Sequence, residues 1–276
     1  MLIIPAVSHP DISRALSIAR GAARAAGAEA LRLQAGIGSR AKADGSPVTD
    51  GDLNADHIVR TALAAAFPAD ATLSEERVDD FERLAQQRVW IIDPIDGTRS
   101  YVAGGDEWAV QVALVVDGEL VLGVLDIPGR GVQVWGAQGL GAGIADATGE
   151  RPLLPHGGVR NVLAGSASER NQKHIAKVLT VLPEFIHLPA QSIGVKAAQI
   201  LLGEADLFVH PRPIAEWDAA APAAVLLWAG AFASDLGGAP LRFNTKTAKV
   251  PGLVFSRRAD HTAICERLRI GGVTIL

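Results

Sequence analysis

Apolar residues recur at intervals of three and four in two stretches near the start of the chain. In the first stretch, which ends at Gly36 and Gly38, they are Ile12, Leu16, Ala19, Ala23 and Ala26. The second stretch follows Thr49, a favoured N-cap residue, and its apolar positions are Leu53, Val59, Ala62, Leu63 and Ala66. This spacing predicts two amphipathic helices, the second with Asp52 in its first turn.

A short apolar run from Val89 to Ile92 predicts a buried strand. Pro94 follows and has no backbone N–H, so strand pairing is expected to stop there, with Asp93 at the strand's end. Gly97 favours a tight turn. Asp93 and Asp96 are therefore expected on one loop.

Alternating apolar positions between Trp108 and Asp126 are interrupted by Asp117-Gly118, a pair typical of a two-residue hairpin turn. Further short strands are expected at 71–73 and 132–135. The first half of the chain is thus predicted to combine two long helices with an antiparallel sheet.

The pattern changes around residues 151–158, where proline and glycine are frequent. Beyond this segment strands and helices are expected to alternate, with strands at 162–164, 185–188, 206–209 and near 232 and 253, and helices over 168–182, 194–202 and 260–268. This alternation predicts an α/β layer and a division into two domains, 1–150 and 151–276.

An Ala- and Leu-rich helix is expected after Glu216-Trp217-Asp218. Because proline is tolerated only in the first turn of a helix, Pro222 predicts that this helix starts near Asp218. Asp218 would then be a simple N-cap, which is the ordinary role of an aspartate at such a position.

Composition narrows the class of protein. Of the 276 residues, 49% are hydrophobic and 20% charged, which excludes a disordered chain. The net charge is -4 without a basic run, so neither a nucleic acid polymer nor an anionic membrane is an expected partner. The longest apolar stretch, 219–233, contains proline and glycine and is too short to span a bilayer. Cys265 is the single cysteine, which favours a reducing, cytoplasmic setting.

Candidate chemistry begins with Asp93 and Asp96. Two carboxylates held close together repel each other, so one is protonated or a cation lies between them. Together with the Ile95 carbonyl they offer the hard oxygen ligands that magnesium prefers. The alternative is an Asp-rich turn after a strand. Equally ordinary roles exist for Asp52, which would complement a helix dipole, and for Glu75, which would face solvent.

Three segments in order resemble the inositol monophosphatase superfamily of magnesium-dependent, lithium-sensitive phosphatases. They are Ser74-Glu75-Glu76, the run Asp93-Pro94-Ile95-Asp96-Gly97-Thr98, and the segment that starts Glu216-Trp217-Asp218-Ala219. Lys42 and the run Thr49-Asp50-Gly51-Asp52 add a further match. The resemblance spans nearly the whole chain and implies alternating layers of helix and sheet, an αβαβα sandwich that combines α+β and α/β parts.

The resemblance also implies roles for individual residues. The ligands of two or more Mg²⁺ ions would be Glu75, Asp93, the Ile95 carbonyl, Asp96 and Asp218. Asp52 and Thr98 would orient and deprotonate the attacking water, while the Gly97 and Thr98 amides would hold the phosphate. The residues around the substrate would be Glu75, Ile95, Asp96, Gly97, Thr98, Lys196 and Asp218.

Loops outside the metal motifs resemble the 3'(2'),5'-bisphosphate nucleotidase branch, which implies adenosine 3',5'-bisphosphate as substrate. Lys196 would then contact the second phosphate, whereas its ordinary role is that of a solvated lysine on a helix. One departure is the segment 166–172, which lacks the histidine that this branch places after its serines.

Alternative substrates are inositol 1-phosphate, histidinol phosphate and fructose 1,6-bisphosphate. A protein that binds metal and phosphate without turnover is a further alternative, although it would not need the pair of Asp52 and Thr98. The expected partner is a small phosphorylated molecule, and the expected assembly is a monomer or a homodimer.

Overall fold

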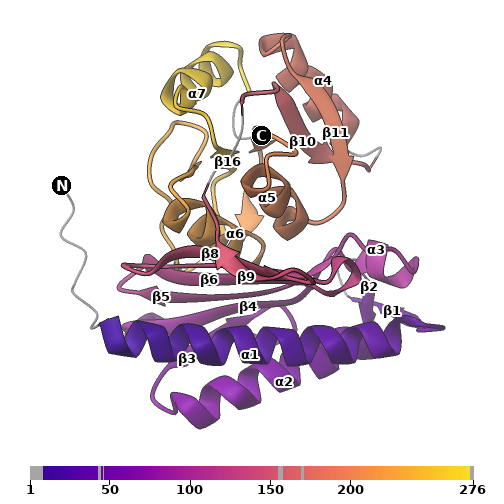
Figure 1. The fold of residues 1–276 in the computed structure, drawn as a ribbon, viewed down its shortest axis with the longest axis vertical. Helices are drawn as coiled ribbons and strands as arrows, with labels where there is room; N and C mark the ends of the chain where they lie inside the picture. The colour runs from indigo at the N-terminus through magenta and orange to yellow at the C-terminus, as the bar shows by residue number, and fades with distance from the viewer. Residues whose placement is uncertain (1–8, 43–44, 46, 155–157, 169–170, 274–276) are drawn as a thin grey trace.

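The computed structural model describes residues 9–42, 45, 47–154, 158–168 and 171–273. Its helices and sheets alternate in layers (Figure 1). Helices α1 and α2 lie on one side of the larger sheet, α5 and α6 lie between the two sheets, and α4 and α7 lie beyond the smaller one. The predicted layered fold is confirmed.

The first layer consists of α1 (His9–Gln34) and α2 (Asp50–Ala66). Helix α1 buries its predicted apolar face, which is formed largely by alanines. Such small side chains let helices approach each other closely. Helix α2 buries Val59 and Leu63 as predicted, but Leu53 is exposed, and Ala55 and Asp56 lie on its buried side instead. Between the helices, β1 (Ser39–Ala41) pairs with β2 (Pro47–Thr49).

The larger sheet has seven strands in sequence order from β3 to β9. They are β3 (Ala71–Ser74), β4 (Arg88–Asp96), β5 (Ala109–Val116), β6 (Glu119–Ile127), β7 (Val132–Ala137), β8 (Gly141–Asp146) and β9 (Gly149–Pro152). Strands β3 and β4 are parallel, and the later pairs are antiparallel. The predicted hairpin turn is confirmed, since Asp117 and Gly118 have φ angles of 52° and 80° between β5 and β6.

Strand β4 does not stop at Pro94 as predicted but continues to Asp96. Asp93 pairs with Gln111 and Asp96 pairs with Ala109, so the register shifts between them. This bulge takes Pro94, which has no N–H to donate, out of the ladder and lets pairing resume. Asp93 and Asp96 therefore lie on a bulged strand and not on a free loop.

The smaller sheet has five strands in the order β11-β10-β12-β16-β14. They are β10 (Val162–Ser166), β11 (Ile186–Ala190), β12 (Leu207–His210), β14 (Phe232–Ser234) and β16 (Leu253–Ser256). The helices are α4 (Gln172–Val181), α5 (Ile193–Leu201), α6 (Glu216–Trp228) and α7 (His261–Ile270). Shorter pieces are α3 (Thr98–Val102), β13 (Ile214–Ala215), β15 (Lys249–Val250) and the 3₁₀ turns Glu82–Ala85 and Pro128–Arg130. The predicted order of elements in this half is confirmed, with ends shifted by a few residues.

Helix α6 begins at Glu216 and contains Pro222 in its interior, so the predicted start near Asp218 is wrong. The N-cap position is held by Ala215, and Asp218 lies in the first turn. Since Pro222 lacks an N–H, the Asp218 carbonyl loses its partner four residues later. Burial of residues 219–226 between the two sheets outweighs that loss.

The segment 153–161 separates the strands of the two sheets along the chain. One continuous hydrophobic core nevertheless contains side chains from both sides of it, because α5 and α6 pack against the larger sheet. The division into domains 1–150 and 151–276 stays a prediction. None of the helices in the described ranges combines the length and the apolar character that a bilayer crossing requires.

Candidate active site

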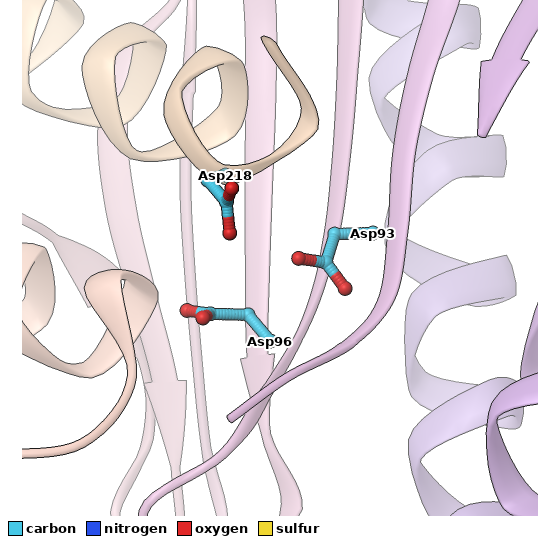
Figure 2. Close-up of side chains that lie close together, drawn as sticks. All are labelled: Asp93, Asp96 and Asp218. Atoms are coloured by element: carbon cyan, nitrogen blue, oxygen red, sulfur yellow. The ribbon is translucent and has the colours of Figure 1, made fainter. Parts of the chain in front are cut away.

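Three carboxylates from distant parts of the sequence meet between the two sheets. Asp93 and Asp96 come from the bulged end of β4, and Asp218 comes from the first turn of α6 (Figure 2). One oxygen atom from each lies within 4.8 Å of the others. Asp93 and Asp96 are buried, and Asp218 is half-buried. The two acids on β4 therefore lie on a bulged strand and not in a turn, and Asp218 lies in the first turn of α6 and not at its N-cap.

The three carboxylates are crowded, and both burial and mutual repulsion disfavour their charged forms. Burial, followed by the charges of Glu75, Asp96 and Asp218, raises the pKa of Asp93 well above its usual value. Burial likewise raises the pKa of Asp96 and of Asp218. Asp93 Oδ2 is buried and has no hydrogen-bond partner among the described residues. A buried oxygen without a donor in a cluster of acids fits a divalent cation with a preference for oxygen ligands.

Helix α5 fixes the orientation of Asp96. Its N-cap residue Ser192 donates through Oγ to Asp96 Oδ2 over 2.5 Å, and the Gly194 amide donates to the same oxygen over 2.7 Å. Ser192 was not among the residues predicted for the site, because nothing in the sequence connects its hydroxyl with an acid 96 positions away. This contact was missed for that reason.

Glu75 follows β3 and lines the same pocket as Asp96 and Asp218. Its Oε1 accepts a hydrogen bond of 2.7 Å from Lys42 Nζ, which also donates to Glu76 over 2.6 Å. Burial alone would lower the pKa of Lys42, but the two glutamates outweigh it and raise that pKa. In this arrangement Lys42 holds the carboxylate that the sequence predicts as a metal ligand.

Asp52 and Thr98 lie together as predicted for a pair that activates water. Thr98 Oγ1 has two acceptors for its single hydroxyl proton, Asp52 Oδ1 at 3.2 Å and the Ile95 carbonyl oxygen at 3.0 Å. The other oxygen of Asp52 accepts from the amide and the hydroxyl of Thr49 in a capping box at the start of α2. Burial raises the pKa of Asp52, although the bonds from Thr49 oppose the shift. Asp52 thus takes part in capping the helix through one carboxylate oxygen and contacts Thr98 through the other.

Gly97 is required by the backbone at the start of α3. Its φ angle is 96°, and a Cβ there would lie 2.7 Å from the Glu107 carbonyl oxygen. A side chain would therefore be strained and would also clash. The predicted role of the Gly97 and Thr98 amides in holding phosphate stays a prediction.

A pocket of about 310 Å³ opens beside these groups. Its lining residues are Pro47, Glu75, Asp96, Gly97, Thr98, Arg99, Ser100, Ser166, Ser168, Asn171, Gln191 and Asp218. Arg99, whose side chain is exposed, supplies a positive charge to this lining. A larger pocket of about 510 Å³ lies along α1 and contains none of the predicted site residues.

The segment 166–172, where the sequence departs from the nucleotidase pattern, borders this pocket. Asn171 donates to Ser166 Oγ over 2.9 Å and accepts from Arg212 over 2.5 Å. Glu169 and Arg170 lie outside the described residues. Nothing in the sequence indicated that Ser166 and Asn171 line the pocket.

Lys196 is buried with an exposure of 2%, so its alternative role as a solvated lysine is wrong. Its Nζ donates to the carbonyl oxygens of Gln191 and Ser192 over 3.0 and 3.1 Å. Burial lowers its pKa to about 8. Lys196 is not among the residues that line the pocket, although Gln191 is. Its contact with a second phosphate stays a prediction.

The chain is similar in sequence to proteins of one family. A sequence profile described as "Inositol monophosphatase family" matches residues 11–270. The chain is 36% identical over 254 residues to the 3'-phosphoadenosine 5'-phosphate phosphatase of Mycobacterium leprae (strain TN), with 87% of this chain and 88% of that protein aligned. It is 31% identical over 208 residues to the 3'(2'),5'-bisphosphate nucleotidase CysQ of Escherichia coli (strain K12), with 74% and 82% aligned.

Solved structures of proteins from the same family superpose on this chain. CysQ from Bacteroides thetaiotaomicron, a bacterial member of the inositol monophosphatase family, superposes with a TM-score of 0.76 at 25% identity over 89% of this chain and 98% of that chain. SuhB of Mycobacterium tuberculosis superposes with a TM-score of 0.74 at 23% identity over 95% and 98%. The second likeness concerns the fold alone.

Proposed function

The chain belongs to the inositol monophosphatase family and is a phosphatase of that family, and we propose that it removes the 3'-phosphate of adenosine 3',5'-bisphosphate. The convergence of Asp93, Asp96 and Asp218 beside the pair of Asp52 and Thr98 carries the proposal, because it joins a cation site to a group that can take a proton. The substrate follows from the names of the relatives at 36% and 31% identity.

The proposed cofactor is Mg²⁺, with two or more ions held by Glu75, Asp93, the Ile95 carbonyl, Asp96 and Asp218. All five proposed ligands offer oxygen atoms to the metal. One of these atoms, Asp93 Oδ2, is buried without a hydrogen-bond partner among the described residues. Bound Mg²⁺ supplies Lewis acidity, which lowers the pKa of water and offsets the negative charge of the phosphoryl-transfer transition state.

The protein's own groups then orient the reaction. With its hydroxyl hydrogen bond directed to Asp52 and not to the Ile95 carbonyl oxygen, Thr98 Oγ1 has its lone pairs free for a water molecule. As the water attacks, it would give one proton to Thr98 Oγ1 while Thr98 gives its own proton to Asp52, which Thr49 holds in place. The Gly97 and Thr98 amides at the start of α3 would hold the phosphate that is removed. Lys196 would contact the second phosphate.

Other features of the proposal come from the sequence alone. A monomer or homodimer in the cytoplasm stays the prediction for assembly and location. A protein that only binds metal and phosphate would have no use for the hydrogen bond between Thr98 and Asp52, which favours turnover.

Side-by-side kinetics test the proposal. We expect kcat/KM for adenosine 3',5'-bisphosphate to exceed that for inositol 1-phosphate, histidinol phosphate and fructose 1,6-bisphosphate, because a remote phosphate and a base add binding energy that aligns the reacting ester. A preference for inositol 1-phosphate would overturn the substrate. Phosphate release that persists in excess chelator would overturn the metal.

A further inference from the structure

A further buried carboxylate, Asp56, contacts the segment that carries Glu75. Its side chain is fully buried. Oδ1 accepts a hydrogen bond of 2.6 Å from Ser74 Oγ, and Oδ2 accepts from Arg77 Nε at 2.9 Å and from Arg60 Nε at 3.1 Å. Unlike Asp93, this carboxylate has donors on both oxygens.

The partners of Asp56 bracket the predicted metal ligand. Ser74 directly precedes Glu75, and Arg77 follows it by two residues, so Asp56 ties down both ends of the segment 74–77. The Glu75 amide donates to the Ile92 carbonyl over 3.2 Å, next to Asp93. The backbone of Glu75 is therefore held against β4 while Asp56 holds its neighbours from below.

Helix α2 relates this anchor to the water-activating pair. Asp52 and Asp56 are four residues apart, which places them on the same side of the helix and about 6 Å apart along its axis. Asp52 bonds to Thr98, and Asp56 bonds to Ser74 and Arg77. One helix thus sets the position of Thr98 and of the Glu75 segment at the same time.

We propose that Asp56 is a positioning residue that holds Glu75 where it can bind a divalent metal ion. The inference rests on the proposed function in one respect, that Glu75 binds metal. Without the anchor, the segment 74–77 gains freedom, and the ion pair between Glu75 and Lys42 competes more effectively for the carboxylate. Residues that support metal ligands in this way typically change metal affinity by about 10-fold or more when replaced.

Two arginines provide a matched pair of variants, because both donate to Asp56 Oδ2. Arg77 belongs to the segment that carries Glu75, whereas Arg60 belongs to the next turn of α2. Their side chains are 52% and 31% exposed, so neither substitution should prevent folding. We expect Arg77→Gln to raise the Kd for Mg²⁺ by about 3- to 10-fold and Arg60→Gln to leave it nearly unchanged.

Asp70 provides the control for Asp56 itself. It lies at the opposite end of β3, its side chain is 8% exposed, and it accepts from Arg88 Nε and from Trp90 Nε1 at 2.9 Å. Asp56→Asn and Asp70→Asn should both lower Tm. Only Asp56→Asn should raise the Kd for Mg²⁺, by about 10-fold, because only Asp56 is tied to the Glu75 segment.

The measurement is calorimetric titration of the metal-free full chain with Mg²⁺ in the absence of substrate, followed by activity at increasing Mg²⁺. The expected result for Arg77→Gln is weaker binding with near-normal kcat at saturating Mg²⁺. Equal effects of Arg77→Gln and Arg60→Gln, or unchanged affinity in folded Asp56→Asn, would overturn the positioning role. Failure of the unaltered chain to bind Mg²⁺ would instead overturn the proposed function.

Discussion

Buried carboxylates are treated in opposite ways in two regions of this molecule. Asp206, directly before β12 of the smaller sheet, is fully buried and accepts from the amides of Arg160 and Val162 at 2.9 Å and from Arg257 Nε at 2.7 Å. Asp93 is equally inaccessible, yet one of its oxygens has no donor among the described residues. Asp206, which serves stability, therefore has donors on both oxygens, whereas Asp93 keeps one oxygen without a donor at the place where a cation is expected.

The same contrast recurs within one turn of α6. Glu216 is fully buried and accepts from the amides of Asn244 and Thr245 and from the Thr245 hydroxyl at 2.8, 2.8 and 2.6 Å. Asp218, two residues later, points toward Asp93 and Asp96 (Figure 2). Glu216 therefore fixes the start of the helix, and this fixed start keeps Asp218 directed toward Asp93 and Asp96.

The largest expected effect comes from Asp93→Asn, which removes the least compensated charge. We expect kcat to fall by about three decades, because the carboxylate charge is needed to hold the cation. In chelator the same variant should be more stable by about 1 to 3 kcal/mol, because an unpaired buried charge is gone. Phosphate release and thermal unfolding of the metal-free protein check both halves. A near-normal rate would contradict the contrast with Asp206.

Asp206→Ala should show the reverse behaviour. Removing the carboxylate leaves Arg257 and the amides of Arg160 and Val162 without this acceptor, so the free energy of unfolding should fall by about 3 to 5 kcal/mol. Mg²⁺ affinity and kcat of the folded fraction should stay close to normal. Denaturant unfolding and calorimetry measure the two quantities, and a large loss of Mg²⁺ affinity would show that the two regions are not independent.

Asp52→Asn should separate the water-activating pair from the cation cluster. We expect kcat to fall by about 100-fold or more because proton acceptance is lost, while Mg²⁺ affinity is retained because Asp52 is assigned to water. Single-turnover kinetics and metal titration provide the readouts. If Mg²⁺ binding disappears, Asp52 belongs with Asp93 instead.

The last expected effect concerns Asp126, a buried acid outside the site that accepts a hydrogen bond from the Gln133 amide. Burial raises its pKa from 3.8 to about 6, while the bond from Gln133 and the charge of Arg24 oppose the shift. Because Asp126 has a higher pKa in the folded chain than in the unfolded chain, protonation of Asp126 stabilises the fold. This stabilisation is fully present below about pH 4 and is lost as pH rises through about 6. The native chain should therefore lose up to about 3 kcal/mol relative to Asp126→Asn between pH 4 and 7.

Denaturant unfolding of both proteins across that range measures the Asp126 effect. Parallel pH profiles would contradict it and would place Asp126 with the fully compensated acids such as Asp206.

Local features of the molecule were predictable from the sequence because they depend on neighbours along the chain. The spacing of apolar residues determined α1 and α2, the Asp117-Gly118 pair determined its hairpin, and Thr49 with Asp52 determined the start of a helix. The resemblance of short motifs then indicated the family and named the acids that meet in the site.

The tertiary structure alone decided how prolines were accommodated and which distant groups meet. Pairing with β5 carried β4 past Pro94 through a bulge, and burial between two sheets kept Pro222 inside α6. The contacts of Ser192 with Asp96 and of Asp56 with the Glu75 segment join residues far apart in sequence. Such contacts depend on how whole layers pack, and local preferences along the chain do not specify them.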